Sequence, residues 1–220
     1  SQAILIRATE PQTLNWIGVV GDTWEKEIDL SDYCYGNISY TVTGSIPGVT
    51  VKAKNNSLIF SGTLTTVTVG TNLTIKAVDE MGSSVTQTVH VYVGNESTVV
   101  AKADELTVVA GSEWTDKEFA VAVGGSGQYT FSAINMPSGL TLDAETGTLS
   151  GKASGVGEYK VQLTVTDQEN PSRSFQTTAL IRVVEQRKIT GTVLDESGKP
   201  VAEAEIICEN LADGSIYTTK

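Results

Sequence analysis

Few residues in this sequence have the chemistry for catalysis. Nucleophilic catalysis needs a base beside the nucleophile, and the chain contains one histidine, His90. His90 alternates with Val89 and Val91, so the two-residue period of a strand places it on the opposite, outward face. The sequence also lacks Gly-x-Ser-x-Gly, His-Glu-x-x-His and Gly-Lys-Ser/Thr, the elements of common hydrolases, zinc proteases and phosphate-binding loops. We expect His90 to be an exposed strand residue without a catalytic role.

The carboxylates Asp143 and Glu145 are a second candidate pair. Paired carboxylates can act as acid and base when they flank a cleft. These two lie in a short run that ends at Gly147, which can adopt the positive φ that tight hairpin turns require. Acidic residues are common in such turns, so the sequence predicts no enzyme within this chain.

The two cysteines, Cys34 and Cys208, lie far apart in the sequence. They fall in separate predicted domains, so a disulfide between them would require an inter-domain contact. We expect two small hydrophobic side chains that are buried or half-buried.

The elements around these residues are predicted to be β-strands. In residues 158–167 apolar and polar side chains alternate, and after a turn containing Pro171 the alternation resumes in residues 175–183. A period of two buries one face of a strand and exposes the other. Two such strands joined by a short polar turn form an antiparallel hairpin, so the sequence predicts an all-β fold.

Three motifs in this region carry a family resemblance. They are Pro-Ser-Gly-Leu-Thr-Leu at 137–142, Thr-Gly-Thr-Leu-Ser-Gly at 146–151, and the alternating strand that ends in Thr166-Asp167. Together they resemble the immunoglobulin-like, cadherin-like repeats of bacterial surface proteins over about residues 98–185. The resemblance implies a β-sandwich in an extracellular, non-catalytic setting, and it implies no particular ligand.

A weaker copy of the same pattern lies about 90 residues upstream. Four anchors recur in the same order: Gly21-Asp22-Thr23-Trp24 with Gly111-Ser112-Glu113-Trp114, Pro47 with Pro137, Ser61-Gly62 with Ser150-Gly151, and Ala77-Val78-Asp79 with Val165-Thr166-Asp167. Such a period indicates a tandem repeat. We therefore predict two sandwiches, at residues 1–95 and 96–186, followed by an incomplete β-domain at 187–220.

The repeat also assigns roles to the tryptophans. Trp24 and Trp114 hold equivalent positions, which favours a shared role in the two cores. Trp16 has no counterpart in the second copy, and it is either buried or a surface contact.

The cadherin resemblance makes Asp79 and Asp167 candidate calcium ligands. Each ends a strand where cadherin repeats place one carboxylate ligand. Calcium takes about six to eight oxygen ligands, however, and the joint Gly94-Asn95-Glu96-Ser97 lacks the acidic Asp-x-Asn-Asp-Asn linker of cadherins. The alternative is that both side chains begin turns by accepting backbone amide hydrogen bonds.

The joints between the predicted domains are short. Four residues are too few for a flexible tether, so we expect an end-to-end pair with restricted bending. The run Ile-Thr-Gly-Thr-Val-Leu-Asp-Glu-Ser-Gly-Lys-Pro at 189–200 resembles the opening of carboxypeptidase-regulatory-like β-domains. Residues 188–220 are too few to close a sandwich core, so we expect an edge-strand contact from this segment to another surface.

Composition limits the partners of this chain. Its net charge is −11, from 26 acidic and 15 basic residues, which disfavours nucleic acid and anionic lipid. No apolar run reaches the roughly 18 residues of a membrane span. We expect a non-catalytic adhesion or spacer module of a bacterial surface or secreted protein, with a cell-surface protein or glycan as partner. The alternative is an accessory region of a large secreted glycan hydrolase or peptidase whose catalytic domain lies outside this chain.

Overall fold

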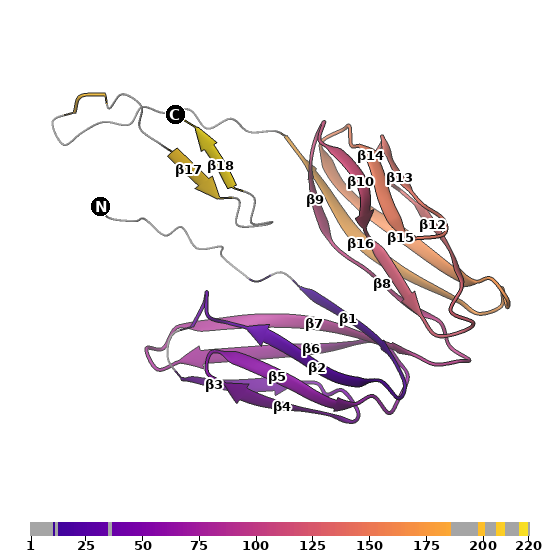
Figure 1. Ribbon diagram of the computed structural model, residues 1–220, viewed down its shortest axis with the longest axis horizontal. Coiled ribbons are helices and arrows are strands. Elements are labelled where there is room, and N and C mark those ends of the chain that lie inside the picture. The colour runs from indigo at the N-terminus through magenta and orange to yellow at the C-terminus, as the bar shows by residue number, and fades with distance from the viewer. Residues whose placement is uncertain are drawn as a thin grey trace. The chain divides into compact units, whose positions relative to one another are not determined.

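The computed structural model describes Pro11, residues 13–34, 37–185 and 198–200, and two strands at 206–209 and 216–219. It divides into two units: Thr9–Glu185, and Ser1–Ala8 together with Gln186–Lys220. All the regular secondary structure among the described residues is β-strand (Figure 1). The all-β prediction is therefore confirmed.

The first sandwich consists of two sheets. One has the strand order β1-β7-β6-β3 and the other β2-β5-β4. Neighbouring strands are antiparallel except β1 and β7, which run parallel. The strands are β1 (Leu14–Val19), β2 (Thr23–Asp29), β3 (Ile38–Thr43), β4 (Val49–Lys54), β5 (Ser57–Thr63), β6 (Thr68–Asp79) and β7 (Ser84–Gly94).

The second sandwich repeats this arrangement. Its sheets have the orders β12-β15-β16-β9 and β10-β14-β13, and β9 and β16 again run parallel. An additional antiparallel pair, β8 with β11, has no counterpart in the described part of the first copy. The strands are β8 (Val100–Ala103), β9 (Leu106–Val109), β10 (Glu113–Glu118), β11 (Ala120–Val123), β12 (Tyr129–Ile134), β13 (Leu140–Leu142), β14 (Thr148–Lys152), β15 (Gly157–Asp167) and β16 (Ser174–Val184).

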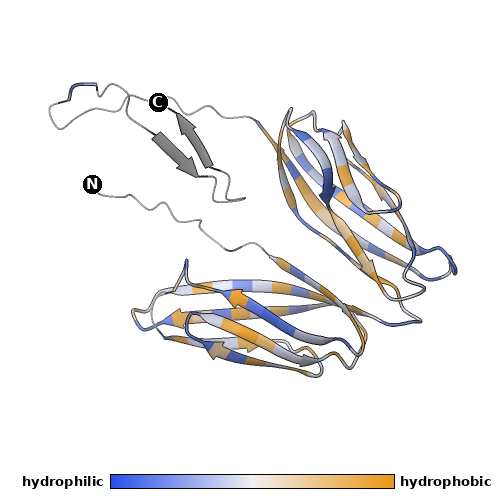
Figure 2. Cartoon of the chain, viewed as in Figure 1, coloured by the Kyte–Doolittle hydropathy of each residue, from blue (hydrophilic) through white to orange (hydrophobic). Residues whose placement is uncertain are grey.

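Alternation in the sequence places the two cores. In β15, Val161, Leu163 and Val165 are fully buried, whereas the residues between them are more exposed. The same alternation of hydrophobic and hydrophilic residues follows other strands (Figure 2). One core extends from Trp16 to Val93 and the other from Val99 to Val183.

The predicted hairpin turns are confirmed. Gly147, between β13 and β14, has a φ of +72°. At the matching turn between β4 and β5, Asn55 has a φ of +54°. Asparagine tolerates the left-handed region better than most residues that carry a Cβ, which explains how the first copy makes this turn without glycine.

The Ser-Gly motifs of the repeat have a steric reason. Gly151 pairs with Leu140 in the β13–β14 ladder, and a Cβ on Gly151 would lie 2.2 Å from the carbonyl oxygen of Gly139. In the first copy, a Cβ on Gly62 would lie 2.0 Å from the carbonyl oxygen of Gly48. The two motifs therefore mark a close approach of neighbouring strands.

Several predictions fall partly or wholly outside the described residues. They include the start of the predicted first sandwich, at residues 1–10, and the start of the predicted third domain. Within that domain, β17 (Ile206–Glu209) pairs antiparallel with β18 (Ile216–Thr219). The carboxypeptidase-regulatory-like resemblance and the edge-strand contact of 188–220 stay predictions.

Candidate functional site

Asp167, the last residue of β15, is fully buried and accepts four hydrogen bonds. The hydroxyl of Ser126 donates to Oδ1 at 2.7 Å, and the backbone N–H of Ser126 donates to Oδ2 at 2.8 Å. The backbone N–H groups of Glu169 and Asn170 also donate to Oδ1, at 2.9 and 3.2 Å. The guanidinium of Arg173 lies 3.7 Å from Oδ2. The carboxylate therefore joins the β15–β16 turn to residue 126, which follows β11.

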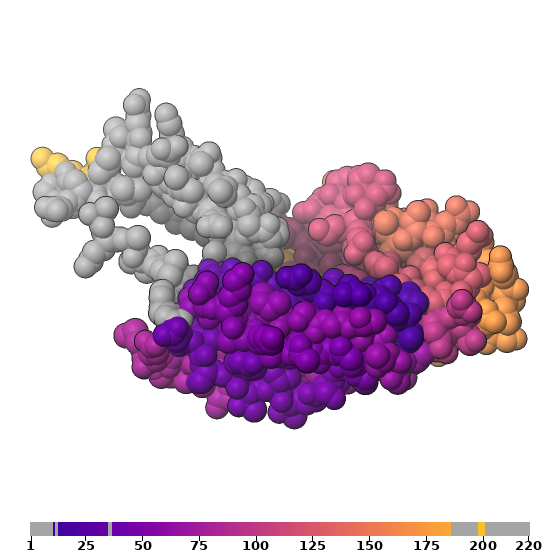
Figure 3. Space-filling view, turned by 60° about the horizontal axis from the view of Figure 1, so that its bottom comes forward, coloured from indigo at the N-terminus to yellow at the C-terminus, as the bar shows by residue number. Residues whose placement is uncertain are grey.

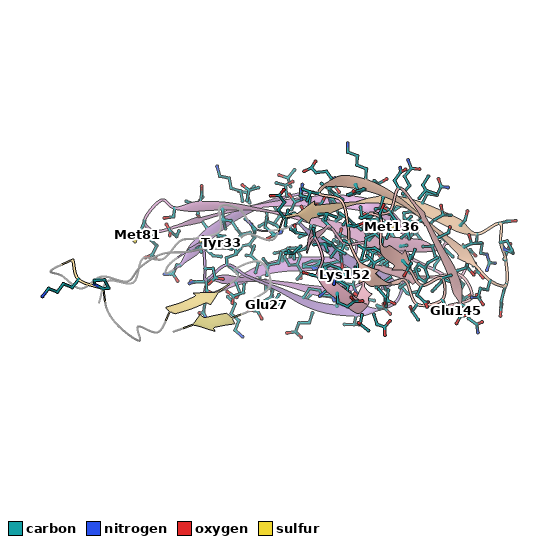
Figure 4. All side chains as sticks on the ribbon, turned by 90° about the horizontal axis from the view of Figure 1, so that it is seen from above. Glu27, Tyr33, Met81, Met136, Glu145 and Lys152 are labelled. Atoms are coloured by element: carbon teal, nitrogen blue, oxygen red, sulfur yellow. The ribbon has the colours of Figure 1, made fainter. Side chains whose placement is uncertain are left out.

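Asp79 takes the matching position at the end of β6 and is also buried. Its Oδ1 accepts the backbone N–H of Met81 at 2.9 Å and that of Ser83 at 2.8 Å. Met81 itself is 83% exposed and projects from this turn (Figure 4). Both aspartates thus have the geometry of turn-initiating carboxylates.

This geometry bears on calcium. A carboxylate oxygen that accepts several N–H groups has fewer lone pairs for a cation. Among the described residues, no three His, Cys, Asp or Glu side chains are grouped so that they could hold a metal ion. The structure places Asp79 and Asp167 as backbone acceptors, which is the second of the two alternatives left open by the sequence.

A melting experiment tests calcium binding. We expect millimolar calcium to leave the melting temperature of the chain unchanged relative to a chelator control, because both candidate carboxylates already accept amide hydrogen bonds. Differential scanning calorimetry measures this directly. A calcium-dependent rise that disappears in Asp79→Asn or Asp167→Asn would instead assign the ion to these residues.

The hydrogen bonds of Asp167 lower its pKa to about 2, from an ordinary value of 3.8. The Ser126 hydroxyl is the largest cause; burial opposes it, and the backbone N–H groups of residues 126, 169 and 170 add to it. Because the pKa is lower in the folded state, the stabilisation is complete above the ordinary pKa. It is lost as the pH falls through the folded value.

Acid unfolding tests this role of Asp167. We expect the second sandwich to lose stability between about pH 4 and about pH 2. Asp167→Asn should be less stable at neutral pH, with a melting temperature lower by roughly 5–15 °C, and should show a flatter acid dependence. Urea unfolding at several pH values measures both effects, and Glu169→Gln is the control for a neighbouring exposed carboxylate. A variant with the acid profile of the wild type would contradict the assignment.

The segment bonded to Asp167 also contacts the joint between the sandwiches. Asn95 and Thr98 exchange two backbone hydrogen bonds of 3.1 Å, so the joint is a closed turn. The N–H of Gly125 donates to the carbonyl of Asn95 at 2.9 Å. A Cβ on Gly124 would lie 2.1 Å from the carbonyl oxygen of Thr98. The joint thus lies directly against residues 124–125, beside the Ser126 that Asp167 binds.

Tyr129 adds a further bond to this segment. Its hydroxyl donates to the carbonyl of Gly124 at 2.6 Å. Burial raises the pKa of Tyr129, and the negative charge of Asp167 raises it further. The hydroxyl is therefore a stable donor at neutral pH.

Side chains from the two copies also meet directly. The amide of Asn15 donates to Asp104 at 3.1 Å, and Asp104 pairs with Lys102 at 2.9 Å. The rings of Tyr92 and Phe175 meet edge to face, with centroids 6.1 Å apart. These contacts and the closed turn agree with the restricted bending expected from the short joint.

The residues first considered for catalysis are dispersed. His90 lies on the outward face of β7, opposite the fully buried Val89 and Val91, as predicted, but it is half-buried rather than exposed. Asp143 accepts the backbone N–H groups of Thr146 and Glu145, and these bonds, the Thr146 bond first, lower its pKa. Glu145 is exposed in the same turn (Figure 4). Both carboxylates thus lie in the predicted hairpin turn.

Cys34 lies in the first core as a fully buried free thiol. Burial is the main reason that its pKa is raised. A protonated, inaccessible thiol is a structural residue rather than a nucleophile.

All three tryptophans pack against a core. Trp16 is 9% exposed and meets Trp24 and Phe60 edge to face, with ring centroids 6.0 and 4.9 Å away. Of the two open alternatives for Trp16, the structure therefore shows burial. Trp24 is buried, whereas Trp114 is only partly buried against the second core. The predicted role of these tryptophans in core packing is therefore clearer in the first copy than in the second.

The parallel pairs of terminal strands were not predicted. In β1 and β7, residues Leu14 to Val19 align with Val89 to Gly94. In β9 and β16, Leu106 to Val109 align with Ile181 to Val184. In each sandwich an early strand, β1 or β9, is thus the parallel neighbour of the last strand, β7 or β16. Hydrophobic alternation reveals strands but not which strand is the neighbour of which, so the sequence carried no signal for this pairing.

A family model described as "Putative Ig domain" matches residues 98–183. These residues include the second core and all the motifs on which the immunoglobulin-like resemblance was based. The match confirms that resemblance for the second sandwich. No curated protein matches the sequence, and no helix among the described residues is long and apolar enough to cross a membrane.

Solved structures give weak likenesses. A "putative alpha-galactosidase" of Bacteroides fragilis NCTC 9343 is 21% identical over 41% of this chain and 18% of its own, with a TM-score of 0.34. Human CDH23 EC21-23 is 16% identical over 67% of this chain and 58% of its own, also at 0.34. The tandem Ig repeats of Dlar are 11% identical over 80% of this chain and 96% of their own, at 0.30. Scores of this size do not establish a shared arrangement over the whole chain.

Proposed function

Because residues 98–183 match the family model and a similar sandwich precedes them, we propose that the chain is a non-catalytic extracellular spacer module. It would hold neighbouring domains of a surface or secreted protein apart under tension. The observation that carries this proposal is that an early strand of each sandwich, β1 or β9, is the parallel neighbour of the last strand, β7 or β16.

Parallel pairing decides how a sandwich responds to a pull on its ends. In the described part of the first sandwich β1 is the first strand and β7 the last, and the start of β1 and the end of β7 lie at opposite ends of one ladder. Tension therefore slides β1 along β7, so the hydrogen bonds between them share the force. In an antiparallel hairpin pulled open from its free ends, the bonds break one pair at a time. In the second sandwich β9 and β16 pair in the same parallel way, and β8, which precedes β9, pairs with β11.

The surroundings of the joint support the same role. Asp167 and Tyr129 hold the 124–126 segment on which the joint lies. A spacer transmits force and distance only if its joints do not bend freely. The non-catalytic part of the proposal is supported by the separation of His90 from the turn carboxylates Asp143 and Glu145. Figure 3 shows the surface of the first sandwich, coloured indigo to magenta.

Single-molecule pulling in two directions tests the proposal. Handles attached at the exposed residues Thr13 and Glu96 load β1 against β7 in shear. Handles at Thr66 and Glu96 open the β6–β7 hairpin from its free ends, because Thr68 lies opposite Val93. We expect a several-fold higher rupture force in the first geometry. Equal forces in the two geometries would contradict a force-bearing role for the parallel pair.

A further inference from the structure

The outer face of the sheet in the second sandwich contains a hollow of about 290 Å³. Its lining residues lie on β12, β15 and β16, which are neighbours in one sheet (Figure 1). Six outward side chains line it in two rows that cross the strands. One row is Ser132, Thr164 and Gln176, and the other is Ile134, Gln162 and Thr178.

The lining is uncharged although the protein is acidic. Five of the six side chains carry a hydroxyl or an amide, and each of these groups can both donate and accept hydrogen bonds. Charged residues of the same face lie outside the two rows, where Arg182 pairs with Glu158 at 3.1 Å. An uncharged lining of this kind is complementary to a neutral ligand that is rich in hydroxyl groups.

Some polar side chains of the hollow have donors and acceptors that are free to bond with a ligand. Within the described part of the chain, the side chains of Gln162 and Thr178 make no hydrogen bond, and the contact between Gln176 and Thr164 is long, at 3.4 Å. Ile134 is 60% exposed and adds an apolar surface on the same side. The volume lies at the lower end of small-molecule sites, which span about 300–1,000 Å³.

We propose that this hollow binds a neutral oligosaccharide. Its sugar hydroxyls would bond with the amides of Gln162 and Gln176 and with the threonine hydroxyls. The apolar C–H face of a sugar ring would contact Ile134. An extended peptide fits less well, because its backbone would pair with the free edge of β12, whereas the hollow lies on the face of the sheet.

The first sandwich shows that the fold does not require this lining. Thr164 lies three residues before Asp167, and the residue three before Asp79 is Lys76, which is exposed. Lys76 stands in a cross-strand row with Thr41 and Thr86, as Thr164 stands with Ser132 and Gln176. A lysine at this position is therefore compatible with the sandwich and provides a substitution that fills the hollow with a charged side chain.

The test measures binding of oligosaccharides to the full 220-residue chain. The probes are hexasaccharides of β-1,4-glucose, β-1,3-glucose and α-1,6-mannose, with an oligogalacturonate as the acidic comparison. We expect saturable binding of at least one neutral probe by calorimetry. Affinity should fall at least tenfold in Thr164→Lys and in Gln162→Ala, with unchanged melting temperatures. Thr86→Ala, at the position of Gln176 in the first copy, is the matched control and should bind as the wild type does.

Four outcomes would overturn the proposal. They are no binding of any neutral probe at millimolar concentration, tighter binding of the acidic probe, unchanged affinity in Thr164→Lys, and binding of an extended peptide that a neutral probe does not displace. The site is separate from the strand pairs β1–β7 and β9–β16. Failure here would leave the pulling result standing, and equal rupture forces would leave the sugar site standing.

Discussion

Gly151→Ala is expected to prevent the second sandwich from folding stably. The new Cβ would lie 2.2 Å from the carbonyl oxygen of Gly139, which is backbone and cannot rotate away. The φ of Gly151 is +113°, a conformation that alanine rarely adopts. Strain from both sources should exceed about 4 kcal/mol, which is a large share of the stability of an ordinary domain.

Gly127→Ala separates the steric clash from the backbone conformation. Gly127 also has a positive φ, +84°, but a Cβ there would meet no atom within 4 Å. It should therefore cost only about 1–2 kcal/mol. Calorimetry, with hydrogen exchange to assign each transition, measures both variants. If the two glycine variants were equally stable, the close approach of Gly139 and Gly151 would not be the reason for the Ser-Gly motif.

Trp16→Ala is expected to destabilise the first sandwich by about 3–5 kcal/mol. The substitution removes a buried ring that meets two other aromatic rings edge to face, those of Trp24 and Phe60. Such pairs add to the free energy of burial. The loss should be confined to the first copy, because Trp16 belongs to its core.

Trp114→Ala is the matched comparison for this prediction. Trp114 is only partly buried against the second core, so its removal should cost clearly less. Urea unfolding followed by hydrogen exchange resolves the two sandwiches and their separate stabilities. An effect of Trp16→Ala no larger than that of Trp114→Ala would mean that the ring contributes little to the core.

Much of the fold could be predicted because it depends on local pattern. Residues such as Val161 and Leu163 alternate with polar neighbours, and a two-residue period has one interpretation when one face of a sheet is buried. Turns were equally accessible, since Asn55 and Gly147 are residues that tolerate positive φ. The position of Asp167 could be predicted as a strand end, with two open interpretations of its role.

The remainder depends on contacts between distant residues. The sequence shows that β1 and β7 are strands, but their parallel pairing depends on how the sheets close. The contact of Gly125 with Asn95 joins residues about 30 apart in the sequence. Neither a glycine nor an asparagine indicates by its type that such a contact exists. The hollow likewise needs three strands in register before Ser132, Thr164 and Gln176 form a row.

The parallel terminal strands also affect how the protein folds during synthesis. Among the described strands, β1 is hydrogen-bonded only to β7, the last strand of the first sandwich. The ribosome therefore exposes β1 long before its partner exists, and its sheet cannot close until residue 94 has emerged. Non-local pairing of this kind slows folding and leaves strand edges open to wrong partners in the meantime. The same delay applies to β9, which is synthesised well before its partner β16. During synthesis of one chain, each of the two similar copies therefore has an early strand whose partner strand has not yet been made.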